Sequence, residues 1–312
     1  MPFQRKLDEE FIEELNQLHD QPASWWRKLV DSKDVFLAIR NNSINAYSNG
    51  MSIGKIVRDI SSGVIKLLVH EEYLSLANTD PYINILSGQT NLYRKLVFDE
   101  KGYLENLDRI KSRAGLFAGN ERIGTNRIGC KVLSVLDMEA AFKGIDQDPN
   151  PENKKEILTK RGRLDLIALT SNFRLVAIEA KLYANKQDLR GKGILEVSNQ
   201  LKDYHHFLST NREDLEVAYQ NMVAIFGKLR GKFFEKRTKQ SNWQKIITNL
   251  ASITIDPVPR LLIFDFDKLQ RKGAYHDANQ IQLHAKKKIP DFNPKCVIKV
   301  GKTDSIMEKH LI

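Results

Sequence analysis

The stretch RGRLDLIALTSNFRLVAIEAKLY, residues 161–183, decides the fold that we predict for this chain. Residues 161–169 and 174–183 are rich in strand-forming residues and partly alternate apolar with polar side chains, which is typical of β-strands. The short turn TSNF between them indicates a β-hairpin. If residues 171–173 form a three-residue loop, the pairing of the two strands is fixed along their whole length.

This pairing brings three charged side chains onto one face of the hairpin. Asp165 lies directly opposite Glu179, and opposed residues of an antiparallel pair share a face. Lys181 follows Glu179 by two residues and therefore projects to the same side. Two carboxylates this close repel each other unless a cation neutralises them, and a hard divalent ion such as Mg²⁺ does so through oxygen ligands. A surface cluster of ordinary ion pairs is the alternative, but the apolar strands around these residues favour a site.

A helix is predicted after the hairpin. In GILEVSNQLKDYHHFL, residues 193–208, apolar residues recur at helical spacing from Ile194 to Leu208. Gln200 and Tyr204 lie one turn apart beside this apolar stripe, so both can face the sheet. A helix edge next to the core would explain the two residues without any function.

These residues together resemble the PD-(D/E)XK nuclease superfamily. Asp165 followed by EAK at 179–181 is similar to the D…(D/E)xK signature of that superfamily. Gln200 with Tyr204 is similar to the QxxxY motif of its exonuclease-like branch. The literal "PD" is missing, because Leu164 precedes Asp165.

The resemblance implies roles for the residues of the hairpin. Asp165, Glu179 and the backbone carbonyl of Ala180 would bind Mg²⁺ or Mn²⁺. Bound metal lowers the pKa of a water and stabilises charge on the phosphate under attack. Lys181 would orient the attacking water or neutralise the developing charge.

The resemblance also implies a fold, an α/β protein with the αβββαβ core of restriction-endonuclease-like proteins and a mixed sheet. The expected elements are a lead helix within 104–127, strands at 132–142, 161–169 and 174–183, a helix at 194–208 and a buried strand at 260–267. Apolar residues at helical spacing from Leu215 to Phe233 predict one long helix inserted before the last strand. We expect residues 101–312 to form the nuclease-like domain, and residues 1–100 a small α+β module of unassigned role.

Many members of this superfamily use one more acidic residue, from a segment before the Asp strand. Glu121, near the end of the expected lead helix, and Glu139, on the first strand, are the two candidates. We favour Glu139 because its strand should neighbour Asp165. The third possibility is that neither carboxylate contacts the metal.

Positive charge is concentrated in the part of the chain that carries these motifs. The net charge is +10, yet residues 1–100 hold 11 basic and 14 acidic residues. Basic residues are densest at 228–245, and a second cluster lies at 286–288. Such residues bind phosphates without reading sequence, although a solvated basic face far from the site is the alternative. The residues selected as contacts to the DNA backbone are Arg230, Lys232, Lys236 and Arg237.

Several protein classes are excluded by what the sequence lacks. Two cysteines and no CxxC pair leave neither a disulfide framework nor a thiolate zinc site. There is no signal-peptide segment and no run of about 18 apolar residues, so we expect a cytoplasmic protein that does not enter membranes. The phosphate-loop, HExxH and Gly-x-Ser-x-Gly motifs are also missing.

We therefore expect a Mg²⁺- or Mn²⁺-dependent nuclease that hydrolyses phosphodiester bonds of DNA, in repair or in defence. RNA as substrate and a homodimer are left open. The alternative is a catalytically inactive nucleic-acid-binding or interaction protein with a nuclease-like fold.

Overall fold

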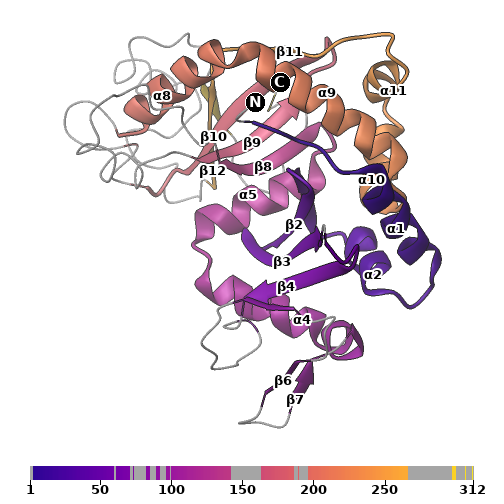
Figure 1. Ribbon diagram of the computed structural model, residues 1–312. Helices are drawn as coiled ribbons and strands as arrows, with labels where there is room; N and C mark the ends of the chain where they lie inside the picture. Colours follow the sequence, from indigo (N-terminus) through magenta and orange to yellow (C-terminus); the bar gives the residue numbers. More distant parts are fainter. Residues whose placement is uncertain are drawn as a thin grey trace, which may run out of the picture. The chain divides into compact units, whose positions relative to one another are not determined.

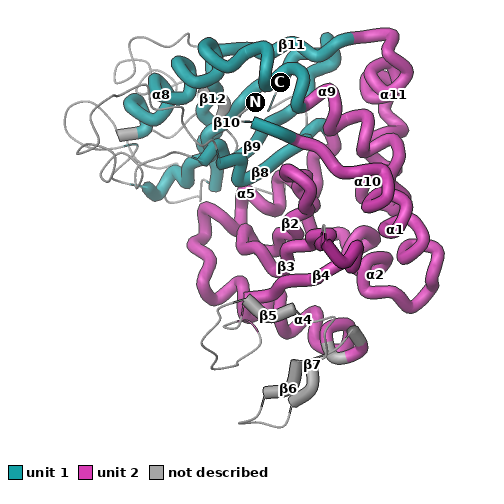
Figure 2. The backbone as a smooth tube through the Cα atoms, in the orientation of Figure 1, with its two compact units in different colours: residues 1–4, 134–218, 252–312 teal, residues 5–133, 219–251 magenta. Residues whose placement is uncertain are grey.

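The computed structural model describes residues 3–59, 61–70, 73, 82–84, 89–91, 96–98, 100–141, 163–185, 189, 196–265, 297–299, 306 and 311. It is a mixed α/β protein with an antiparallel sheet and a mixed sheet (Figure 1). The chain divides into two compact units, each made of more than one segment (Figure 2). The antiparallel-sheet unit comprises residues 5–133 and 219–251, and the mixed-sheet unit comprises residues 1–4, 134–218 and 252–312.

The antiparallel-sheet unit is a strand meander with helices on either side of it in the sequence. Its sheet has the order β1-β2-β3-β4-β5, and every neighbouring pair is antiparallel. Asn49 and Gly50 join β2 to β3 with φ values of 53° and 77°, the left-handed backbone of a two-residue hairpin turn. The elements are α1 Glu9–Asp20, α2 Trp25–Asp31, β1 Phe36–Arg40, β2 Ser43–Ser48, β3 Met51–Arg58, β4 Ile65–His70, β5 Tyr82–Asn84, β6 Gln89–Asn91, β7 Leu96–Phe98, α4 Glu100–Phe117, α5 Asn120–Lys131, the second part of α9 Arg212–Lys228, α10 Lys232–Thr238 and α11 Ser241–Ile247.

Aromatic side chains hold the two ends of this unit's sequence together. The ring of Trp26 lies 6.3 Å from that of Phe234, and the ring of Phe36 lies 5.2 Å from that of Phe233. Trp26 is completely buried. Each buried aromatic ring removes a large apolar area from water, so residues 219–251 complete the core that begins near residue 25.

The helix predicted from Leu215 to Phe233 is two helices, so that prediction was wrong. α9 ends at Lys228 and α10 begins at Lys232. Gly231 interrupts them with φ at 118°, a backbone conformation that side chains rarely adopt. The helical spacing of apolar residues continues across the break because both helices bury one face in the same core.

The mixed-sheet unit carries the hairpin. Its sheet has the order β13-β12-β10-β9-β8, and β11 also pairs with β10. β8, β9 and β10 are antiparallel neighbours, whereas β11 and β12 run parallel to β10, and β13 runs parallel to β12. The elements are β8 Val135–Ala141, β9 Arg163–Leu169, β10 Arg174–Leu182, α8 Glu196–Thr210, the first part of α9, β11 Thr254–Ile255, β12 Arg260–Phe264 and β13 Val297–Lys299.

The predicted meander, the helix after it and the buried strand at 260–264 are thus present. Leu164 and Leu166 on β9 and Ile178 on β10 are fully buried, as expected for the face opposite the charged residues. On α8, Val197 and Leu201 are buried as well. Glu179 and Lys181 on the polar face of β10 are buried too, which raises the cost of keeping charges there.

The division into units differs from the boundary expected at residue 100. Residues 101–133, with α4 and α5, belong to the antiparallel-sheet unit. Polar contacts tie both helices to it: Lys111 on α4 forms an ion pair of 2.9 Å with Asp34, and Asn126 on α5 accepts a hydrogen bond of 3.0 Å from the backbone of Gly50. The expected lead helix therefore lies in a different compact unit from the strands that it should precede.

Candidate active site

The site is built on the hairpin of β9 and β10, which pair in the register that the sequence predicts. Ile178 pairs with Leu166, so the next step along the ladder sets Asp165 opposite Glu179. The loop is three residues long and ends at Phe173 with φ at 62°, the left-handed position typical of such loops. The turn chemistry therefore fixes which side chains of the two strands meet.

Three of the predicted residues lie together on this face. The Lys181 ammonium nitrogen is 2.8 Å from Oε1 of Glu179, and only 8% and 3% of the two side chains are exposed. The backbone N–H of Ala180 donates a hydrogen bond of 2.7 Å to Oδ2 of Asp165. Neighbouring strands thus hold the Glu179 carboxylate and the Lys181 ammonium group in a largely water-free place, with the half-buried Asp165 beside them.

The electrostatic environment raises the pKa of Asp165 well above its usual range. Burial is the main cause, because it disfavours the charged carboxylate, and the negative charges of Glu179 and Glu139 act in the same direction. The Ala180 hydrogen bond and the positive charge of Lys181 lower the pKa but do not compensate. A cation bound beside Asp165 would favour its charged form and so lower this pKa.

The side chains of this site that can ligate a metal are better suited to Mg²⁺ than to a tightly held structural metal. Among the described residues, no three histidine, cysteine, aspartate or glutamate side chains converge to form a metal site. Mg²⁺ usually takes one or two protein carboxylates and completes its coordination with water and substrate oxygens. Asp165 and Glu179 supply two carboxylates of this kind, so the residues present are compatible with a magnesium ion shared with a substrate.

The two upstream acidic residues lie in different units. Glu139 is on β8, where Met138 pairs with Leu166 and Ala140 pairs with Leu164, so Glu139 comes next to Asp165 in the ladder. Glu121 is on α5 of the antiparallel-sheet unit. Of these two, Glu139 is the one whose charge affects the pKa of Asp165.

The QxxxY residues are on α8. Tyr204 is 5% exposed, and its hydroxyl donates a hydrogen bond of 3.0 Å to the backbone carbonyl of Arg163 on β9. Burial raises the pKa of Tyr204, and the nearby carboxylates of Glu179 and Asp165 raise it further. The oxygen Oε1 of Gln200 is buried, and no described residue donates a hydrogen bond to it.

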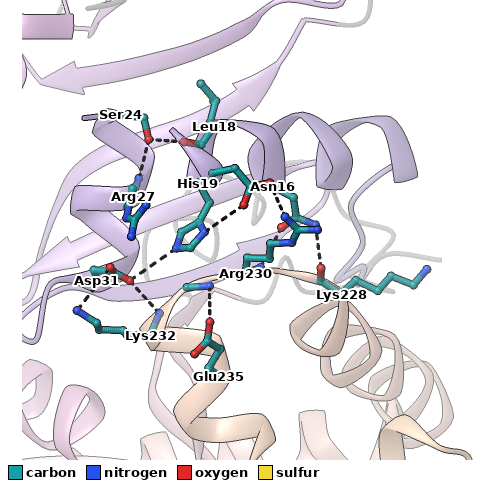
Figure 3. Close-up of polar contacts among 12 residues, drawn as sticks. Asn16, Leu18, His19, Ser24, Arg27, Asp31, Lys228, Arg230, Lys232 and Glu235 are labelled. Atoms are coloured by element: carbon teal, nitrogen blue, oxygen red, sulfur yellow. Dashed lines mark hydrogen bonds and ion pairs between the residues drawn. The ribbon is translucent and has the colours of Figure 1, made fainter. Parts of the chain in front are cut away.

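The basic segment predicted to bind DNA belongs to the antiparallel-sheet unit, where acidic residues of α1 and α2 pair with it (Figure 3). Arg230 forms an ion pair with Asp20, and the ammonium group of Lys232 lies 3.6 Å from Asp31. The Arg230 and Lys232 side chains remain 57% and 65% exposed, and Lys236 is exposed too. The other basic cluster, residues 286–288, lies outside the described residues.

The selection of Arg237 as a DNA contact was wrong. Its side chain is buried, with the guanidinium carbon 3.9 Å from the centroid of the Phe233 ring and 5.3 Å from that of Phe36. The guanidinium donates hydrogen bonds to the carbonyls of Gly129 (2.9 Å) and Phe233 (3.2 Å). In a helix, three- and four-residue spacing decides which side faces the core, and a run of basic letters does not reveal it.

Arg163 is a site residue that was not selected from the sequence. It is the first residue of β9, and its Nη1 lies 3.5 Å from Oε2 of Glu139. It precedes Asp165 by two residues, so the alternation used for Lys181 would have placed it on the same face. The two-residue period of β9 is therefore the sequence signal that identifies Arg163.

Comparison with family models, curated proteins and solved structures found no match to this chain. Within the described residues, no helix combines the length and the apolar composition that crossing a membrane requires.

Proposed function

We propose that the chain is a divalent-metal-dependent nuclease that hydrolyses phosphodiester bonds of DNA. One observation carries the proposal: the hairpin register sets Asp165 opposite Glu179, with Lys181 in contact with Glu179 at 2.8 Å on a buried face. Burying Glu179 and Lys181 together beside the half-buried Asp165 costs free energy, which a structural role alone does not require, since apolar residues would fill the same volume at lower cost.

The proposed roles follow from the chemistry of each group. Asp165 and Glu179, with the carbonyl of Ala180, would hold Mg²⁺ or Mn²⁺. Such an ion lowers the pKa of a bound water and stabilises negative charge on the phosphate. Lys181 lies beside Glu179, where its ammonium group can orient the attacking water or neutralise charge in the transition state. The buried surroundings strengthen each of these electrostatic interactions.

The fold proposed for the mixed-sheet unit is the restriction-endonuclease-like one. The antiparallel order of β8, β9 and β10, followed by α8 and by β12 parallel to β10, supports it. The assignment of α4 and α5 to the other unit is a departure from the expected αβββαβ core.

For the DNA backbone, the candidates that retain exposed side chains are Arg230, Lys232 and Lys236. Ion pairs between exposed side chains contribute little to stability, so exchanging them for phosphates is inexpensive. We propose these three residues as sequence-independent phosphate contacts, without Arg237.

A cleavage assay tests the proposal. Purified wild-type protein is incubated with supercoiled plasmid, linear duplex, single-stranded DNA and single-stranded RNA, each with Mg²⁺, Mn²⁺ or EDTA. We expect metal-dependent cleavage of DNA that EDTA abolishes and that Asp165→Asn lacks. Cleavage by Asp165→Asn at the wild-type rate would place the activity elsewhere, and no cleavage of any substrate by folded wild-type protein would refute the proposal.

A further inference from the structure

Arg163 lies where the polar face of the hairpin opens toward solvent. Its side chain is 60% exposed, whereas Glu179 and Lys181 on the neighbouring strand are 3% and 8% exposed. Strand alternation places Arg163 on the same side of β9 as Asp165. Its backbone is fixed, because the Tyr204 hydroxyl donates a hydrogen bond to its carbonyl. An exposed guanidinium on a fixed backbone thus lies beside the Glu139 carboxylate.

Glu139 is the only ion-pair partner of Arg163 among the described residues. Only 8% of the Glu139 side chain is exposed, and its φ is 52°, in the middle of a strand. A glutamate in the left-handed region is strained, since glycine, asparagine and aspartate are the residues that tolerate it. Such strain persists where the surrounding structure enforces it, and it is concentrated at functional sites.

We propose that Arg163 binds a non-bridging oxygen of the substrate phosphate, and that Glu139 is a positioning residue for Arg163 rather than a metal ligand. This inference rests on the proposed nuclease function and names the group that holds the phosphate. A guanidinium offers five N–H donors in a planar fork that matches phosphate oxygens. Within the described residues, Glu139 is the one ion-pair partner of these donors, which leaves most of them for a ligand.

Two observations favour positioning over metal ligation for Glu139. Its Oε2 faces a guanidinium at 3.5 Å, so part of its charge is already neutralised. The described carboxylates also do not converge in a group of three, as they should if Glu139 completed a metal site with Asp165 and Glu179. The site thus separates into two carboxylates for the metal and a Glu–Arg pair for the phosphate.

The simplest competing explanation is that Arg163 and Glu139 form an ordinary ion pair. The same sheet contains a matched control: Arg174, the first residue of β10, lies 3.5 Å from Asp256, with its side chain 47% exposed. The two arginines have the same separation from their partners, but Arg174 is at the loop end of the hairpin, away from Asp165 in the strand register. A general effect of removing a surface arginine would appear equally in Arg163→Ala and in Arg174→Ala.

The test measures oligonucleotide binding without cleavage, so every protein carries Asp165→Asn. Fluorescence anisotropy gives the Kd of a labelled duplex and a labelled single strand over a salt series. Arg163→Ala should weaken binding about 10- to 100-fold, the scale of a hydrogen bond to a charged group. The log–log salt slope for the duplex should fall by about 0.9, as for one lost phosphate contact. Arg163→Lys should restore the slope but only part of the affinity, and Arg174→Ala should match the parent protein.

The same set of variants tests whether Glu139 positions Arg163 or binds the metal. Glu139→Gln should weaken oligonucleotide binding, and adding it to Arg163→Ala should cause no further loss. In the otherwise wild-type protein, Glu139→Gln should leave the Mn²⁺ affinity, measured by electron paramagnetic resonance, within about twofold of the wild-type value, as expected for a residue outside the coordination sphere.

Two results would overturn the inference: equal binding by the Arg163→Ala and Arg174→Ala proteins, or a tenfold or larger loss of Mn²⁺ affinity in Glu139→Gln. Both measurements are independent of turnover. A wild-type protein that cleaves nothing would refute the nuclease function, whereas a wild-type protein that cleaves while Arg163→Ala binds normally would refute only the role of Arg163.

Discussion

Lys181 and Glu179 form a buried ion pair on alternate residues of one strand, 2.8 Å apart, with neither side chain more than 8% exposed. Neighbouring strand residues point to opposite faces, so a pair two residues apart is the closest that one strand can present on a single face. The pair holds an ammonium group beside a carboxylate without help from a loop. The sheet therefore fixes the backbone positions from which both charged side chains project.

The first prediction concerns Lys181. Lys181→Ala should lower turnover at saturating metal by about 10²-fold or more, the scale of one lost electrostatic stabiliser, and change metal affinity far less. It also leaves Glu179 buried without its cation, so the free energy of unfolding should fall by about 3 kcal/mol or more. Urea denaturation and single-turnover cleavage measure the two effects. Glu179→Gln/Lys181→Met should regain stability but not activity, and normal turnover in Lys181→Ala would contradict the role.

The second prediction concerns Asp165 and pH. Its pKa is raised in the folded protein, so the folded state binds this proton more tightly than the unfolded state, and stability falls as pH rises between the unfolded and folded pKa values. Asp165→Asn should therefore unfold at a higher temperature than wild type at pH 7, with the difference vanishing near pH 3. Calorimetry across this range tests it. Mg²⁺ should raise the wild-type melting temperature and leave that of the variant unchanged.

The third prediction concerns α8. Tyr204→Phe removes the hydrogen bond to the Arg163 carbonyl and should cost about 1 kcal/mol of stability while lowering kcat. Gln200→Leu removes a buried oxygen that no described residue hydrogen-bonds, so it should not destabilise the fold. A fall in kcat for Gln200→Leu at unchanged melting temperature would separate a substrate contact from a structural role. Full activity in both variants would make the QxxxY match coincidental.

The fourth prediction concerns Arg237. Arg237→Met should lower the free energy of unfolding by about 2 to 4 kcal/mol, because the two carbonyls lose a buried donor and the aromatic rings lose a cation. Lys236→Met, one residue earlier and exposed, is the control and should change stability by less than about 0.5 kcal/mol. Chemical denaturation compares them. Equal stability of the two variants would show that the burial of Arg237 has no energetic role.

The fifth prediction concerns Gly231. A Cβ added there would lie 2.5 Å from a methyl carbon of Val30, at a φ of 118° that side chains rarely adopt. Gly231→Ala should therefore destabilise the protein by about 1 to 3 kcal/mol. Gly119→Ala, where the added Cβ meets nothing within 4 Å and φ is −70°, should be neutral. Val30→Ala in the Gly231→Ala protein should relieve the steric part, and the strain from φ should remain.

The hairpin was predictable because its information is local. Strand alternation and one loop length decide the register, and Asp165, Glu179 and Lys181 follow from it. The burial of Arg237 and the helix break at Gly231 could not be predicted in this way. They depend on contacts with Phe36 and Val30, which lie about 200 positions earlier in the sequence. The sequence also does not reveal which compact unit residues 101–133 belong to. This depends on tertiary contacts, which the periodicity of apolar residues does not encode.

The antiparallel-sheet unit is made of two segments that lie far apart in the sequence, so the ribosome synthesises its parts at different times. Glu9, Asp20 and Asp31 find their basic partners 201 to 219 residues later in the chain. At about 5–20 residues per second, the ribosome delivers those partners roughly 10 to 40 s after the acidic helices have emerged. During that interval Trp26 also lacks the aromatic ring of Phe234. α1 and α2 are thus made well before the segment that completes their surroundings, and the nascent chain exposes an unfinished aromatic core until residues 219–251 have left the exit tunnel.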